Sequence, residues 1–316
     1  MKIIQTFSQF DEGLPYFNND ESNKNIVYKN FYSFLLSMLT LKKYYGKVDM
    51  YCNQKAYDSF IKYIPYNDII IKENNNSISL WNYYKVDVLK TIDGKFIHVD
   101  SDVFIFDDLY REFIETDKYD AIIQDITQPK EAEWAIRDLF TANAKFFKDN
   151  NIIDPKDYDN RFVSAGTIGM TEEVKNNFID ISTRIKRAYD KQKLINNGLI
   201  MTLISEEVAF YLTLLKYKYK VFEVLPYDLI VEHGQHHAGN IKKYSHYWGS
   251  SKTQAYHLNI IKNKLISDFP EYSTLIAQYE KDRKNELNSN SDDFSRFNDF
   301  MKPMGKMNMI PDQNFI

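Results

Sequence analysis

The sequence predicts an α/β protein in which helices flank a mostly parallel sheet. Two observations carry this prediction. Short apolar runs alternate with stretches of helical periodicity through the first hundred residues, a pattern typical of strands joined by crossover helices. The chain has 316 residues, of which 44% are hydrophobic, enough for one large α/β domain or two small ones.

Each element follows from its own pattern. Apolar runs predict strands at residues 2–7, 48–52, 69–71, 96–99, 121–123, 161–170 and 221–225. Helical spacing predicts helices at residues 29–45, 54–63, 80–92, 172–189 and 206–217, and Gly46 is expected to end the first of them. Parallel sheets bind ligands at the carboxyl ends of their strands, which directs attention to Thr6–Phe7, Cys52 and Asp100.

No repeat and no clear linker occurs before residue 268. We therefore expect one domain over residues 1–268, followed by a polar helix and an irregular tail over residues 269–316. The end of this tail is polar and interrupted by proline, but it carries Met301, Met304, Met307 and Met309. We interpret it as an interaction segment that docks onto the catalytic domain, an acceptor carrier or a partner protein.

Composition and charge exclude several classes. The net charge is −4 and no basic stripe is present, which argues against a nucleic-acid partner. The single cysteine, Cys52, excludes an intrachain disulfide and fits a reducing compartment. No apolar stretch is long enough for a signal peptide or a membrane span. We expect a cytoplasmic protein, and the abundance of Lys, Asn, Ile and Tyr fits an AT-rich bacterial or phage genome.

The segment GKFIHVDSDVFIFDDL, residues 94–109, carries the chemistry. An apolar strand runs directly into Asp100-Ser101-Asp102, and a second apolar run follows. Two carboxylates at positions i and i+2 at a strand end can reach one hard cation such as Mg²⁺ or Mn²⁺ from the same side. Paired aspartates after a strand also form simple Asx turns, so the pattern alone leaves both interpretations open.

The stretch SLWNYYKVDVLKTIDGKFIHVDSDVFIFDDL resembles the D-x-D region of GT-A glycosyltransferases, in particular glycosyltransferase family eight (glycogenin-like and bacterial galactosyltransferase-like enzymes). Tyr84-Lys85 stands where that family has Tyr-Arg, and Asp108-Leu109 matches its closing pair. The resemblance implies a Rossmann-like GT-A fold, a Mn²⁺ or Mg²⁺ cofactor and a nucleotide-sugar donor, with UDP-sugar as the expected donor and a carbohydrate or other hydroxyl as the acceptor.

The resemblance also implies site residues. Ser164-Ala165-Gly166 stands where the family has Asn-Ala-Gly. Glu206 and Glu207 stand where it has its Asp-Gln pair, and His257 stands where it has its third metal ligand. The family's Gly and Lys-Pro-Trp after that histidine have no counterpart after His257. The expected sets are Asp100, Asp102 and His257 for the metal; Phe7, Tyr84, Lys85, Asp100, Ser164, Gly166 and Lys262 (or Lys264) for the donor; and Glu206 and Glu207 for catalysis.

Other interpretations of these residues stay open. His257 also suits a core histidine, Glu206 and Glu207 suit a helix start where acids meet the dipole, and Lys85 suits a solvated helix face. The histidines in EHGQHHAGN lack a cysteine partner for zinc. The expected function is a metal-dependent hexosyltransferase. The alternatives are a non-catalytic GT-A-like binding or structural protein of a phage or surface assembly, and a nucleotidyltransferase.

Overall fold

The computed structural model describes residues 1–9, 23–74, 83–127, 144–150, 152, 154, 161–192, 204–233, 235–246 and 255–288. Its strands are β1 (Lys2–Phe7), β2 (Asp49–Cys52), β3 (Ile69–Ile71), β4 (Phe96–Val99), β5 (Val103–Ile105), β6 (Ala121–Thr127), β7 (Phe162–Met170), β8 (Val221–Glu223) and β9 (Tyr244–His246). Its helices are α1 (Asn23–Tyr45), α2 (Gln54–Ser59), α3 (Tyr83–Leu89), α4 (Arg111–Glu115), α6 (Ala144–Asp149), α7 (Glu172–Gln192), α9 (Ala209–Tyr217), α10 (Tyr227–His233), α11 (Gln235–Lys242), α12 (Ala255–Asp268) and α13 (Ser273–Asn288).

Seven strands form a mixed, mostly parallel sheet in the order β3-β2-β1-β4-β7-β6-β8. Only β7 runs antiparallel to its neighbours β4 and β6 among the described strands of this sheet. β5 and β9 form a separate antiparallel pair. The predicted α/β class is therefore confirmed.

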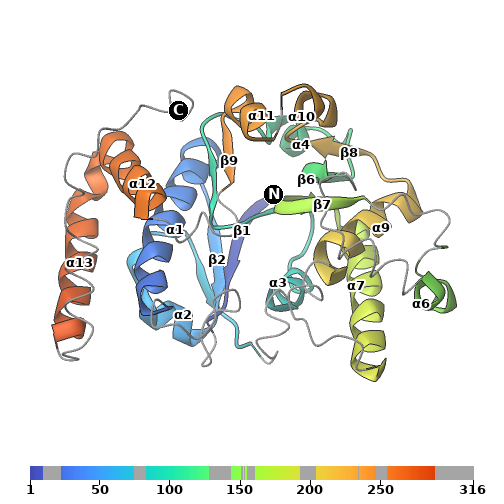
Figure 1. Cartoon of the computed structure of the whole chain (residues 1–316), viewed down its shortest axis with the longest axis horizontal. Coiled ribbons are helices and arrows are strands. Elements are labelled where there is room, and N and C mark those ends of the chain that lie inside the picture. The colour runs from blue at the N-terminus through green and yellow to red at the C-terminus, as the bar shows by residue number, and fades with distance from the viewer. Residues whose placement is uncertain are drawn as a thin grey trace.

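Helices cover both faces of the sheet (Figure 1). Successive residues of β1 point to opposite sides, since Ile3 belongs to the apolar cluster that includes α1 and Ile4 to the cluster that includes α3, α7 and α9. Burial on both faces explains why the strands are almost continuously apolar in sequence. Among the described helices, none combines the length and apolar character that a membrane span requires.

Several local predictions are confirmed, and some are corrected. Gly46 follows α1 with a φ of +77°, and its N–H donates to the carbonyl of Lys42, as expected for a residue that ends a helix. The helix predicted at residues 54–63 is divided into α2 and a 3-10 turn, Ile61–Tyr63. The helix predicted at residues 206–217 begins instead as a π-helical turn, Ile204–Val208, before α9. Such turns are frequent at functional sites.

The helix α13 packs against the main body of the protein. The ring of Tyr279 stacks on Phe31 of α1 with 3.7 Å between centroids, and Tyr32 donates a hydrogen bond to Glu280. The described part of residues 269–316 thus contacts the domain predicted for residues 1–268, and the division between the two stays a prediction. Residues 289–316, which include the methionine-rich tail, lie outside the described residues.

Candidate functional site

The order in which the chain adds strands to the sheet reverses between β1 and β4, which makes this point a topological switch point. β2 and β3 extend the sheet to one side of β1, and β4 pairs with its other side. In open α/β sheets, the crevice beyond the strand ends at such a switch point is the usual ligand site. β4 ends at Val99, so Asp100 is the first residue beyond the strand at this point.

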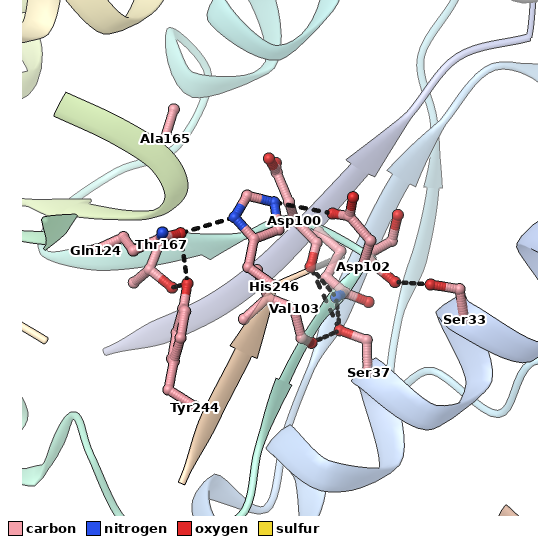
Figure 2. Close-up of polar contacts among 12 residues, drawn as sticks. Ser33, Ser37, Asp100, Asp102, Val103, Gln124, Ala165, Thr167, Tyr244 and His246 are labelled. Atoms are coloured by element: carbon pink, nitrogen blue, oxygen red, sulfur yellow. Dashed lines mark hydrogen bonds and ion pairs between the residues drawn. The ribbon is translucent and has the colours of Figure 1, made fainter. Parts of the chain in front are cut away.

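Backbone hydrogen bonds hold the turn Asp100–Asp102. The Asp100 N–H donates to the carbonyl of Gly166 at 2.8 Å, and the Val103 N–H donates back to the carbonyl of Asp100 at 3.1 Å. Two hydroxyl groups of α1 also hold this segment by hydrogen bonds. Ser33 donates to the carbonyl of Ser101 at 2.9 Å, and Ser37 donates to the carbonyl of Val103 at 2.6 Å (Figure 2). The two carboxylates therefore project from a fixed backbone.

His246 joins the two aspartates through the small β5–β9 sheet. Its backbone pairs with Val103, the residue that follows Asp102. The imidazole Nε2 lies 3.5 Å from Asp102 Oδ1, and one ligand atom each of Asp100, Asp102 and His246 lie within 4.8 Å of one another (Figure 2). Asp102 is only 6% exposed, and a buried carboxylate needs a compensating positive charge. Two carboxylates and an imidazole are a suitable ligand set for a divalent cation such as Mn²⁺.

Lys85 lies on the other side of Asp100 and is buried. Its Nζ is 2.9 Å from Asp100 Oδ1, 2.5 Å from Glu206 Oε1 and 3.2 Å from the carbonyl of Ala165. Burial by itself lowers the pKa of Lys85, but the two carboxylates outweigh it and raise that pKa above its ordinary value. The ammonium group is therefore a fixed positive charge.

The charges of this cluster do not balance. Asp100, Asp102 and Glu206 contribute three carboxylates, whereas Lys85 contributes one ammonium group, which leaves two formal negative charges. A divalent cation beside Asp100 and Asp102 would neutralise this excess. The fit to a metal therefore rests on charge as well as on the identity of the ligands.

Glu207 lies next to this cluster in the π-helical turn. Its Oε1 accepts a hydrogen bond from the Ala165 N–H at 3.4 Å. Burial raises the pKa of Glu207 well above its ordinary value, and the negative charge of Glu206 adds to the effect. The two adjacent acids therefore differ: Glu206 forms an ion pair with Lys85, whereas the pKa of Glu207 lies above its ordinary value.

The structure brings together most of the predicted site residues but not all of them. Lys85, Asp100, Asp102, Gly166, Glu206 and Glu207 surround one region. Ser164 lies two residues before Gly166 on β7, opposite Asp125. Tyr84 is buried in the core on α3, 2% exposed, and its hydroxyl has no hydrogen-bond partner among the described residues.

Three predicted residues have other surroundings. Phe7 packs against Phe34 and Phe60 in an aromatic cluster at the end of β1. Lys262 forms an ion pair with Glu280 of α13 at 2.6 Å. His257 lies in the first turn of α12 and is partly exposed. The Asp-Asp-His group of the described residues contains His246 and not His257.

Two residues of the site were not expected from the sequence. One is His246, and the other is Gln124, whose Oε1 lies 2.8 Å from His246 Nδ1. A signal for His246 was present, because Gly249 and Lys252 follow it, in the order in which the resembled family has Gly and Lys after its metal-binding histidine. Gln124 is recognisable only from the folded structure.

Comparisons with known proteins give partial likenesses. The galactosyltransferase LgtC, solved with donor and acceptor sugar analogs, has a TM-score of 0.43 at 10% identity over 83% of this chain and 94% of that chain. Mouse xyloside xylosyltransferase 1 has a TM-score of 0.39 at 10% identity over 70% of this chain and 84% of that chain. The inositol-1-phosphate CTP transferase from T. maritima has a TM-score of 0.35 at 11% identity over 72% of this chain and 86% of that chain.

Likenesses at this level carry no information on the reaction, and no curated protein matches the sequence. A family assignment is nevertheless available, because one family matches residues 1–279, which is most of the chain. The protein belongs to the family of unknown function DUF6734.

Proposed function

We propose that this protein is a metal-dependent glycosyltransferase that moves a hexose from a nucleotide-sugar, with UDP-sugar as the first candidate, to a hydroxyl of an acceptor. The observation that carries the proposal is the Asp100–Asp102–His246 group at the switch point of the sheet. The resemblance of residues 79–109 to the D-x-D region of glycosyltransferases supports the same reaction class.

The metal ligands in this proposal are Asp100, Asp102 and His246. His246 takes the role that the sequence suggested for His257, because it is the histidine whose ring reaches Asp102. A Mn²⁺ or Mg²⁺ ion bound there would offset the charge that develops on the departing nucleoside diphosphate. The protein's own contribution is a pair of carboxylates on a rigid turn.

Lys85 and Glu206 act as supports in this proposal. Lys85 holds Asp100 in place and reduces the repulsion among the carboxylates, and Glu206 in turn holds Lys85. Lys85 is therefore proposed to position a metal ligand rather than to bind diphosphate directly, because three oxygen atoms already surround its ammonium group.

Glu207 is the proposed catalytic carboxyl. It is the acid of the pair that has no described ion pair with Lys85, and a carboxyl with a raised pKa is suited to hold and exchange a proton. Gly166 and Ser164, on the strand that runs past Asp100, are proposed to border the donor sugar. Phe7 and Tyr84 remain candidates for contacts with the nucleotide.

The test is a donor screen. UDP-, GDP- and CMP-sugars are incubated with the protein and Mn²⁺, and donor hydrolysis and thermal stabilisation are measured for wild type and Asp102→Asn. We expect one sugar nucleotide to be hydrolysed and to stabilise the wild type only in the presence of metal, and Asp102→Asn to lose both effects. Metal-dependent stabilisation by a sugar nucleotide without hydrolysis would favour a non-catalytic binding protein. Cleavage of a nucleoside triphosphate in place of every sugar nucleotide would favour nucleotidyl transfer.

A further inference from the structure

Gln124 lies on β6 at an irregularity of the sheet. The pairing of β6 with β7 shifts register between Ile123 and Asp125, where Gln124 of β6 lies opposite the longer segment Ala165–Thr167 of β7, so β7 bulges opposite Gln124. In a regular strand, adjacent side chains point to opposite faces. Here the side chains of Gln124 and Asp125 meet, and Gln124 Nε2 donates to Asp125 Oδ2 at 2.9 Å. Both residues are 1% exposed.

This contact fixes which way the Gln124 amide faces. The reversed amide would set its carbonyl oxygen against the carboxylate of Asp125, and two acceptors without a proton repel each other. The carbonyl oxygen Oε1 therefore faces the opposite way, where it accepts a hydrogen bond from the Tyr244 hydroxyl at 2.9 Å and lies 2.8 Å from His246 Nδ1.

The amide in turn fixes the state of His246. A carbonyl oxygen can only accept, so Nδ1 of His246 must carry the proton that lies between them. In the neutral ring, Nε2 then keeps its lone pair. Nε2 is also the atom that faces Asp102, at 3.5 Å (Figure 2).

Gly166 leaves space for this hydrogen bond. A Cβ at this position would lie 2.6 Å from both Nδ1 and Cε1 of His246, and would also collide with Oε1 of Gln124. Contacts this short force neighbouring atoms to move, so the absence of a side chain at residue 166 is a condition for the observed position of His246.

We infer that Gln124 is a positioning residue for the metal site. Through its hydrogen bond to Nδ1 it holds the ring of His246 in the tautomer that presents the Nε2 lone pair to a divalent cation, and Gly166 provides the space for this contact. The inference rests on the proposed function in one respect: the cation is the one assigned to Asp100, Asp102 and His246. Hydrogen-bond partners of this kind typically change metal affinity by about 10–100-fold.

The first experiment needs no metal. The ¹⁵N chemical shifts of His246 report which ring nitrogen carries the proton, and they are measured for metal-free wild type, Gln124→Leu and Tyr244→Phe. Tyr244→Phe is the matched control, because it removes a buried hydrogen bond of the same network but leaves the contact between Gln124 and His246. We expect the proton on Nδ1 in wild type and Tyr244→Phe, and a mixture or reversal of tautomers in Gln124→Leu.

The second experiment measures Mn²⁺ affinity by electron paramagnetic resonance of the free ion. Gln124→Leu should bind Mn²⁺ about 10–100-fold more weakly than wild type, and Gly166→Ala should also bind more weakly because it displaces the ring. Tyr244→Phe should stay within a factor of about three, below the range typical of groups that orient a ligand. Gln124→Met, which keeps the length of the side chain but removes its acceptor, should weaken Mn²⁺ binding as Gln124→Leu does, and it serves if Gln124→Leu does not fold.

The outcomes separate the two proposals. A wild type that binds no Mn²⁺ would refute the metal site, whereas the tautomer measurement would still decide the role of Gln124. If wild type binds Mn²⁺ and Gln124→Leu keeps both the tautomer and the affinity, the metal site stands and the positioning role is wrong. If Tyr244→Phe weakens binding as much as Gln124→Leu, the effect belongs to the packing of the network, and the positioning role is again wrong.

Discussion

Two lysines that both carry an ion pair to a glutamate have very different environments. Lys85 is enclosed near the turn Asp100–Asp102, and the side chains of its pair with Glu206 are 9% and 8% exposed. Lys262 pairs with Glu280 between α12 and α13, where the side chains are 29% and 23% exposed. Desolvation is costly for the first pair and small for the second. The same residue types therefore support a buried charge cluster in one region and a helix contact in the other.

The largest expected effect is the loss of the buried lysine. Lys85→Met should lower the free energy of unfolding by about 3–5 kcal/mol, because it leaves Asp100 and Glu206 facing each other without a cation. The matched variant Lys262→Met should cost less than about 1 kcal/mol. Urea denaturation measures both values. Equal losses in the two variants would show that the contrast between the two regions is wrong.

A double variant sharpens this prediction. Lys85→Met with Glu206→Gln should be more stable than Lys85→Met alone, because the second change removes one of the stranded charges. Glu280→Gln should give no such recovery when it is added to Lys262→Met. Additive losses in both pairs would contradict a coupled buried cluster.

The contrast within the acid pair predicts a dependence on pH. The raised pKa of Glu207 means that the folded protein holds this proton more tightly than the unfolded chain. The contribution of protonated Glu207 to the free energy of unfolding is fully present below the ordinary glutamic acid pKa, near 4.3. It is lost as the pH rises through the raised pKa of the folded protein. Glu207→Gln should therefore be more stable than wild type at pH 8 by more than about 0.5 kcal/mol, the scatter of neutral substitutions, and should show no gain at pH 4. A constant difference between the two proteins from pH 4 to pH 8 would contradict the raised pKa.

The smallest expected effect concerns the tail. Removal of residues 289–316 leaves α13 complete, with Tyr279 stacked on Phe31. The melting temperature and donor binding should stay nearly unchanged, while association or acceptor use should fall if the tail is an interaction segment. An insoluble truncated protein would show that the tail is part of the fold.

The sequence predicted the features of the fold that local residue patterns determine. Apolar runs predicted the strands of the main sheet but not β5 and β9, and the carboxyl-end rule directed attention to Asp100. The position of His246 beside the aspartates was not predicted, because it depends on the pairing of β9 with β5, which joins segments far apart in the chain. Gln124 was missed because the sequence of β6 does not show that this residue lies opposite an irregular segment of β7.

The partner of an ionic residue was also beyond the sequence. Lys85 and Lys262 both lie in helices, and the resemblance implied a donor contact for both. Their partners, Glu206 and Glu280, follow from how α3 and α12 pack against distant segments. Burial decides what such a lysine does, and burial is set by the tertiary structure.

The metal site itself is tested most directly by Mn²⁺ binding to four proteins. Isothermal titration with and without UDP is performed on wild type, Asp102→Asn, His246→Leu and His257→Leu. We expect wild type and His257→Leu to bind one Mn²⁺ with similar affinity, and we expect Asp102→Asn and His246→Leu, each folded by circular dichroism, to lose this binding. The account is contradicted if wild type binds no Mn²⁺, or if His257→Leu loses the ion while His246→Leu keeps it.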